Sequence, residues 1–280
     1  MKVESLHTYP VKSMRGIRMA RSLLTPSGLL GDRRFMITDA NGHFITQREC
    51  QALAQIQALP QGAYLLLRKG DEEIMVVPPR GERMDVAIWR SIVNASVAPE
   101  SVNARLSAWL GREVKFVFAD AESERYSSPE WAGEGADVGF ADGYAVLVTT
   151  TASLKALNQY IESQGQAPVG MERFRPNIVV DTHEPWAEDR WAAIEINGVR
   201  LDIVKPCERC IMTTQDQMTG ERGGPDPLPA LRHMRFSTDK RAPGPIFGWN
   251  AVPRGQVELN VGDQVTVVEE RAEGWPLKQR

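Results

Sequence analysis

One stretch of the sequence decides the fold class: Ala193-Ile194-Glu195-Ile196-Asn197-Gly198-Val199-Arg200-Leu201-Asp202-Ile203. On each side of Asn197-Gly198 the apolar and polar residues alternate, which is the pattern of a strand with one buried and one solvated face. The Asn-Gly pair predicts a two-residue turn, because glycine tolerates a positive φ. We therefore expect a β-hairpin over residues 193–203 that packs one face on a hydrophobic core.

Similar signals predict that the chain is rich in short strands. Asn41-Gly42, for example, lies between two apolar runs, as a hairpin turn does. Strands are expected at residues 35–38, 44–46, 64–67, 74–77, 86–89, 114–118, 144–148, 178–180 and 265–268. Short strands with frequent turns are typical of barrels and sandwiches, so we predict a mostly β (α+β) fold.

Only two helices are expected, which disfavours a doubly wound sheet. Ser101 is the predicted cap of the first, which Gly111 ends, and Thr150 or Thr151 begins the second. Residues 119–143 are acidic, rich in glycine and serine, and without clear periodicity. We place a domain boundary there, with a β-barrel-like domain over residues 1–120 and a second β-barrel over residues 121–280.

The composition excludes several classes of protein. The chain has 280 residues, 42% of them hydrophobic and 25% charged, and three cysteines are too few for a disulfide scaffold. Residues 51–67 are uncharged but carry four glutamines and Pro60, so they do not predict a membrane span. The N-terminus has no apolar signal core. We expect a cytoplasmic protein with no membrane span.

Charge is unevenly distributed along the chain. Residues 1–34 hold seven Lys and Arg against Glu4 and Asp32, a net charge of +5, whereas the whole chain carries −3. Nucleic-acid binding would need a broader basic excess, so we expect no nucleic-acid partner. A small anionic ligand needs only two or three converging cations, which this segment can supply. A solvated basic face would have the same net charge.

The spacing of Cys207-Glu208-Arg209-Cys210 is the most informative in the chain. Structural zinc sites and iron–sulfur clusters both require four ligands, and the chain has only three cysteines. A thioredoxin-like pair lies at the start of a helix, whereas here the pair is followed by Ile211 in an extended or turn-like segment. Two inert buried thiols are a further interpretation. The last is one thiolate that binds a soft metal or metal cofactor, favoured by the neighbouring Arg209.

Other segments offer groups that bind anions. Arg175 and Asn177 stand two apart just before a predicted strand, and in extended chain they point to the same side. Arginine grips phosphate with two parallel hydrogen bonds, and a lysine such as Lys12, after the first strand, binds it as a point charge. Each segment alone is equally compatible with a surface turn.

Taken in order, these segments resemble the MOSC family, the molybdenum cofactor sulfurase C-terminal domain proteins. The chain is most similar to the two-part members with an N-terminal MOSC β-barrel domain, such as the amidoxime-reducing components and their bacterial relatives. The resemblance is carried by the stretches Val11-Lys12-Ser13, Gly31-Asp32-Arg33-Arg34, Phe174-Arg175-Pro176-Asn177, Cys207–Cys210 with Thr213-Thr214 after it, and Val261-Gly262-Asp263.

The resemblance implies a bound molybdenum cofactor, molybdenum held by molybdopterin. It implies that Cys210 is the metal ligand and that Asp142 lies near the metal, so both are candidate catalytic residues. The cofactor-binding residues it implies are Lys12, Ser13, Arg33, Arg175, Asn177, Glu208, Arg209 and Cys210. After Asp142 the amidoxime-reducing proteins have hydroxyl residues, where this chain has Gly143 and Tyr144.

The activity implied is reduction of N-hydroxylated compounds: hydroxylamines, amidoximes or N-hydroxylated bases. We expect no iron–sulfur cluster or haem in this chain, since it has three cysteines and no C-x-x-C-H motif. Electrons must then come from an external donor protein, which we expect to be a reductase, a ferredoxin or a small haem protein. The alternative functions are a carrier of the cofactor or of a persulfide on Cys210, without turnover, and a binding module without metal.

Overall fold

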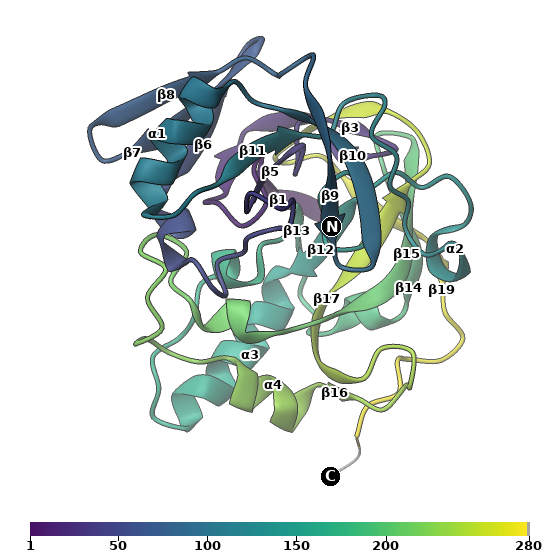
Figure 1. Ribbon diagram of the computed structural model, residues 1–280. Coiled ribbons are helices and arrows are strands. Elements are labelled where there is room, and N and C mark those ends of the chain that lie inside the picture. The colour runs from purple at the N-terminus through teal and green to yellow at the C-terminus, as the bar shows by residue number, and fades with distance from the viewer. Residues whose placement is uncertain (279–280) are drawn as a thin grey trace.

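The computed structural model describes residues 1–278, and it confirms the mostly β fold. Its largest sheet has nine strands, and smaller sheets of four, three and three strands surround it. Figure 1 shows β6–β8 and α1 at one end of the molecule and α3 and α4 together near the other. Within residues 1–278, no helix is long and apolar enough to cross a membrane.

The nine-stranded sheet closes into a barrel. Its strands, in spatial order, are β19 (Val265–Glu270), β14 (Trp191–Ile196), β15 (Val199–Glu208), β17 (Gly244–Pro253), β12 (Val146–Thr150), β13 (Ile178–Asp181), β1 (Lys2–Thr8) and β2 (Ile17–Met19), with β16 (Phe236–Ser237) on β17. The amide of Val3 donates to the carbonyl of Asp263, at 2.8 Å, and the amide of Val265 donates to that of Met1, at 2.9 Å. These bonds join the first strand of the chain to the segment that leads into the last.

The hairpin predicted over residues 193–203 is confirmed as β14 and β15. Ile196 pairs with Val199, and the turn residues Asn197 and Gly198 have φ of 49° and 78°, as a tight hairpin turn requires. Ile194, Ile196, Leu201 and Ile203 are buried in the barrel core, and Val199, next to the turn, is partly buried against it. The pattern of apolar side chains thus sets which face of the hairpin points inward.

The smaller sheets stand beside the barrel. They consist of β5 (Phe35–Thr38), β11 (Lys115–Phe118), β10 (Ser91–Val97) and β9 (Arg83–Ile88); of β6 (Gln57–Gln61), β7 (Tyr64–Lys69) and β8 (Glu72–Val76); and of β18 (Val257–Asn260), β3 (Arg21–Thr25) and β4 (Gly28–Leu29). Several predicted strand bounds need correction here, and Val77 and Val114 lie just outside β8 and β11. Of the strand expected at 44–46 only Phe44 bridges to Thr38, and Trp89 lies in the turn after β9 rather than in the strand.

The helices agree only in part with the sequence. Helix α3 (Thr151–Ser163) is capped as expected, because the Thr150 hydroxyl accepts a hydrogen bond from the amide of Ser153. Helix α1 (Glu100–Leu110) ends at Gly111, but its cap is Pro99, so the prediction that Ser101 caps it is wrong. Two short helices were not expected: α2 (Pro129–Ala132), which lies in the stretch 119–143 without clear periodicity, and α4 (Leu228–Met234). The 3₁₀ turns are η1 (Gln51–Gln55), η2 (Met171–Phe174), η3 (Ala187–Asp189) and η4 (Ile211–Thr214).

The path of the chain brings distant segments together. Strand β1 belongs to the barrel, the chain then leaves it to build the sheets of β5–β11, and it returns at β12. Hydrogen bonds between β1 and β13 therefore cross the predicted boundary at residues 120 and 121, which stays a prediction. The turn after β1 and the loops of the barrel face each other as a result, and a cavity lies between them.

Candidate functional site

The nine side chains predicted for the site all line this one cavity. They are Lys12, Ser13, Arg33, Asp142, Arg175, Asn177, Glu208, Arg209 and Cys210. The first three follow β1 or precede β5, the next three lie just before β12 and β13, and the last three lie at the end of β15 or directly after it. The roles assigned to them from the sequence stay predictions, whereas their juxtaposition is a property of the fold.

Two arginines share one aromatic platform. The guanidinium carbons of Arg33 and Arg175 lie 4.4 Å and 4.2 Å from the centre of the Tyr9 ring, a distance typical of cation–π contact. The Tyr9 side chain is buried and donates its hydroxyl hydrogen to the carbonyl of Pro176, at 3.1 Å. Burial lowers the pKa of Arg175 to about 10. The neighbouring Tyr9 opposes this lowering, whereas the positive charge of Arg33 adds to it.

Neighbouring groups fix how these arginines lie. The Arg33 guanidinium donates to the Asp32 carboxylate at 2.6 Å and to the Asn177 amide oxygen at 3.1 Å. That oxygen also accepts from the amide of Leu147, so Asn177 ties Arg33 to the barrel wall. Arg175 donates to the carbonyl of Met14 at 2.9 Å. The side chains are thus held in place before any ligand arrives.

Lys12 and Asp142 form a close ion pair at the cavity wall. The Lys12 ammonium lies 2.5 Å from the Asp142 carboxylate and also donates to the carbonyl of Phe140, at 3.1 Å. Burial lowers the pKa of Lys12, and its pairing with Asp142 opposes that effect. Desolvation in the concave site would raise the pKa of Asp142, but Lys12 and Arg48 outweigh it and hold that pKa well below its usual range. The Asp142 carboxylate, 71% exposed, is therefore ionised and open to a ligand.

The two cysteines of the C-x-x-C stretch differ in their surroundings. Cys210 is exposed and directly precedes the turn η4, and its sulfur accepts a hydrogen bond from the Arg48 guanidinium at 3.2 Å. Cys207 is half-buried on β15, where burial raises the pKa of its thiol and Arg209 donates to its sulfur at 2.8 Å. Cys210 is thus the thiol that an incoming group can reach.

The remaining predicted residues occupy different parts of the wall. The Glu208 carboxylate accepts a hydrogen bond from Lys205 at 2.8 Å, so its negative charge is paired with a positive one.

Three residues of the site have a left-handed backbone: Ser13, Arg33 and Arg175, with φ of 64°, 47° and 53°. Such conformations are unfavourable for residues with a Cβ and concentrate at functional sites.

Two arginines of the site escaped the sequence argument. Arg48 lines the cavity and contacts Cys210, but it lies in the stretch Gln47-Arg48-Glu49-Cys50, 162 residues from that partner. Arg125 is buried and donates to the carbonyls of Gly139 and Ala141 at 2.9 Å and 2.6 Å, which holds the loop that carries Asp142. Their positive charge was the only signal, and it does not distinguish them from surface arginines.

The residues fit an anionic cofactor that brings its own metal ligands. Five cations line the cavity against two carboxylates, namely Lys12, Arg33, Arg48, Arg175 and Arg209 against Asp142 and Glu208. The Nε of Arg209 is buried and has no hydrogen-bond acceptor within residues 1–278. The described chain also has no group of three or more His, Cys, Asp and Glu placed to hold a metal ion. One accessible thiol and excess positive charge suit a metal that a phosphate-bearing cofactor already chelates.

Comparison with known protein families and curated proteins gives matches over most of the chain. Residues 1–113 match the model of the MOSC N-terminal beta barrel domain, and residues 135–266 match that of the MOSC domain. The chain is 27% identical over 276 residues to mitochondrial amidoxime-reducing component 1 of Danio rerio, which covers 94% of this chain and 83% of that protein. It is 28% identical over 284 residues to the human mitochondrial amidoxime reducing component 2, covering 94% and 82%.

The chain is also similar to part of a longer protein and to a solved structure. The molybdenum cofactor sulfurase of Solanum lycopersicum is 26% identical over 292 residues, covering 93% of this chain but 35% of that protein. Among solved structures, the YUAD protein from Bacillus subtilis is 10% identical, with a TM-score of 0.42 over 94% of this chain and 93% of the other. The two domain models account for both the barrel and the sheets beside it, and the protein belongs to the MOSC family, as a member with an N-terminal MOSC β-barrel domain.

Proposed function

We propose that this protein is a molybdenum cofactor-dependent reductase of N-hydroxylated compounds, such as hydroxylamines, amidoximes and N-hydroxylated bases. The observation that carries the proposal is the cavity itself, in which the accessible thiol of Cys210 faces an excess of fixed cations. The names of the amidoxime-reducing relatives support the choice of substrate class.

The residues of the cavity divide into two groups by their chemistry. Lys12, Arg33, Arg175 and Arg209 would hold the cofactor, because each brings a positive charge to a phosphate dianion. Cys210 would bind the molybdenum through its thiolate, which is a soft ligand. Ser13, Asn177 and Glu208 line the wall between these groups, where Asn177 orients Arg33.

The reaction consumes two electrons and two protons, as R–NH–OH + 2 e⁻ + 2 H⁺ gives R–NH₂ + H₂O. When bound, the cofactor supplies a two-electron reductant at the N–O bond, and the protein positions and tunes it. Asp142 is ionised, so it would accept a hydrogen bond from the substrate's N–H or O–H group and orient it. Lys12, whose pKa burial lowers, holds that carboxylate in place.

The electrons would come from a separate protein. The sequence has three cysteines, no haem-attachment motif and no glycine-rich nucleotide-binding stretch after a strand. A reductase, ferredoxin or small haem protein that docks at the open side of the cavity would therefore supply them. In the proposed function this chain holds the site where the substrate is reduced, and the partner protein supplies the electrons.

The test is a pair of assays on the protein purified from a host that makes the cofactor. With a reduced viologen as donor, it should convert benzamidoxime to benzamidine. NADPH alone should give no conversion, and adding a reductase that passes electrons singly should restore it. The proposal is contradicted if cofactor-loaded protein shows no turnover with reduced viologen. It is also contradicted if the pure chain oxidises NADPH steadily.

A second candidate function is a carrier of the cofactor or of sulfur. It is favoured by the exposure of Cys210 and by the similarity to the sulfurase of Solanum lycopersicum over 93% of this chain. A carrier would release molybdopterin to a cofactor-free acceptor enzyme or show a persulfide mass of +32 Da on Cys210, without turnover. The viologen assay and mass spectrometry of the same sample separate the two functions.

A further inference from the structure

Trp89 has a backbone conformation that calls for an explanation. Together with Arg90 it forms the two-residue turn between β9 and β10, and its φ is +55°. Such turns usually take asparagine or glycine, whereas a bulky side chain is strained there. Strained conformations of this kind concentrate at functional sites. In residues 1–278 the other residues with a Cβ and positive φ are Ser13, Arg33, Arg175, Trp186 and Asn197, and three of these five line the cavity.

The Trp89 side chain reaches three groups of the site, one of which is the Lys12 ammonium, 5.8 Å from the centre of its ring. Its indole nitrogen donates to the Asp142 carboxylate at 3.3 Å, and the Arg48 guanidinium carbon lies 5.1 Å from the centre of its ring. The ring of Phe44 packs edge-on against it, with centres 5.0 Å apart. Trp89 is not one of the residues that line the cavity, and it contacts the site through these neighbours.

Arg48 links the indole to the exposed Cys210 thiol. Its guanidinium stacks on Trp89 and donates to the Cys210 sulfur at 3.2 Å. A long, flexible arginine chain needs a second contact to keep one geometry, because it loses rotamer freedom when held. The indole supplies that contact.

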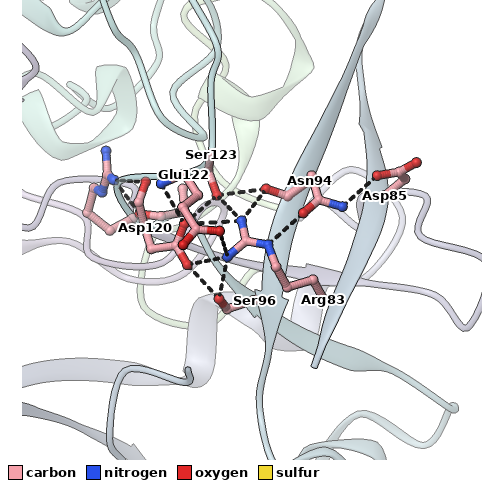
Figure 2. Close-up of polar contacts among 9 residues, drawn as sticks. Arg83, Asp85, Asn94, Ser96, Asp120, Glu122 and Ser123 are labelled. Carbon is pink, nitrogen blue, oxygen red and sulfur yellow. Dashed lines mark hydrogen bonds and ion pairs between the residues drawn. The ribbon is translucent and has the colours of Figure 1, made fainter. Parts of the chain in front are cut away.

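The hairpin that carries Trp89 is anchored at its base. Figure 2 shows the Arg83 guanidinium between β9 and the segment after β11, where it donates to both carboxylate oxygens of Asp120, at 2.6 Å and 3.1 Å. Ser96 of β10 donates to the same carboxylate at 2.6 Å, and Asn94 accepts from Arg83 at 2.6 Å. Both strands of the hairpin are thus tied to one point, which fixes the position of its tip.

We propose that Trp89 is a positioning residue of this site, which holds Arg48 over the Cys210 sulfur and Asp142 against Lys12. The role of Trp89 toward the substrate rests on the proposed function. Its effect on Arg48 and Cys210 can be measured without turnover. A guanidinium held at the sulfur attracts anionic groups to Cys210. The same arrangement orders the carboxylate that would orient the N-hydroxylated substrate.

The first test measures the selectivity of Cys210 toward charged reagents in the cofactor-free full chain. At one pH, the ratio of alkylation rates with iodoacetate and iodoacetamide is followed at Cys210 by peptide mass spectrometry, so that the intrinsic reactivity of the thiol cancels. Arg48→Ala should lower this ratio by about fivefold, the factor for a unit charge at about 4 Å in water. Trp89→Gly should lower it nearly as far, and Trp89→Phe should restore it because the ring remains.

The variants are chosen so that folding does not obscure the result. Glycine adopts φ of +55° without strain, so Trp89→Gly should keep the hairpin intact. Ile92→Ala is the matched control, because Ile92 lies on the same hairpin and is 67% exposed. It should leave the ratio unchanged. A wild-type ratio in Trp89→Gly, beside a lowered ratio in Arg48→Ala, would overturn the proposal.

The second test uses the cofactor-loaded protein. Trp89→Gly should keep the molybdenum content of the wild type but lose about tenfold in kcat/KM, as outer contacts of a metal site commonly do. Loss of molybdenum in Trp89→Gly would make the residue part of cofactor binding and contradict the positioning role. If no variant, the wild type included, reduces substrate while the alkylation ratios change as expected, then the proposed function fails and the positioning of Arg48 stands.

Discussion

At the scale of single residues, Cys207 and Cys210 have the same chemistry but different access. Cys210 is exposed, whereas Cys207 is half-buried and its thiol pKa is raised by burial. Cys210→Ala should therefore lose the molybdenum and reduce activity by more than about 100-fold, with little change in the thermal midpoint. Cys207→Ala should keep most of the metal. Metal analysis and thermal melts of both variants check this, and loss of metal in Cys207→Ala alone would reverse the assignment.

Gly16 provides a test of the arginine platform that changes no charge. A Cβ at this position would lie 2.3 Å from Cε1 of the Tyr9 ring, on which Arg33 and Arg175 rest. Because Tyr9 is buried, its ring must shift, and both arginines shift with it. Gly16→Ala should weaken cofactor binding by about tenfold, as the loss of supporting contacts does at metal sites.

The control for this prediction is Gly223→Ala. An added Cβ there meets nothing within 4 Å, and its φ is not positive, so cofactor binding should be unchanged. Cofactor occupancy is measured by molybdenum analysis and by fluorescence of the oxidised pterin. Wild-type occupancy in Gly16→Ala would show that the Tyr9 platform does not hold the cofactor.

The sequence pointed to cations beside strand ends, but it could not show what each one contacts. Lys12, Arg33 and Arg175 were identified because motifs of a known family surround them. Arg48 and Arg125 were missed, because the first acts on a thiol far along the chain and the second on backbone carbonyls, which every sequence offers. A residue whose role lies in a long-range contact leaves no local signal.

At the scale of elements, strands with alternating patterns were predicted well. The hairpin of β14 and β15 is confirmed because its turn chemistry and its apolar face agree. Helices α2 and α4 were missed because one or two turns are too short to show helical periodicity. Ser101 was wrongly taken as the cap of α1, because the helix begins two residues earlier than that cap implies, directly after Pro99, and Ser101 lies in its first turn.

The anchor of the β9–β10 hairpin predicts a pH-dependent stability. Hydrogen bonds from Arg83 outweigh desolvation and hold the pKa of Asp120 well below its usual range. A carboxyl with a lowered folded pKa stabilises the protein above its unfolded pKa of about 3.9, and this contribution is lost as the pH falls through the folded value. Asp120→Asn should therefore lower the free energy of unfolding at pH 7 by about 2 kcal/mol.

Urea unfolding at several pH values measures this difference. It should be constant from pH 7 down to about 5 and shrink as the pH falls below about 4. Asp85→Asn on the same hairpin is the control, since Asp85 accepts one hydrogen bond from Asn94 at the surface, and it should cost much less. An equal cost for Asp120→Asn at low and neutral pH contradicts the account.

At the scale of the whole molecule, the closure of the barrel was beyond the sequence. Strand β1 pairs with β13, about 170 residues away, and contacts the segment before β19 at the far end of the chain. Nothing local to residues 2–8 specifies these partners. The same closure brings Lys12 and Arg48 from the first part of the chain to Cys210 in the last, so the site exists only in the assembled fold.

The central claim is that this assembled cavity binds a molybdenum cofactor, and metal content tests it most directly. Protein purified from a host that makes molybdopterin should contain about one molybdenum per chain, held by the Cys210 thiolate. Cys210→Ala and Arg175→Ala, purified in the same way, should contain much less. A wild-type protein that folds but contains no molybdenum, or a Cys210→Ala variant with as much molybdenum as the wild type, would contradict the account.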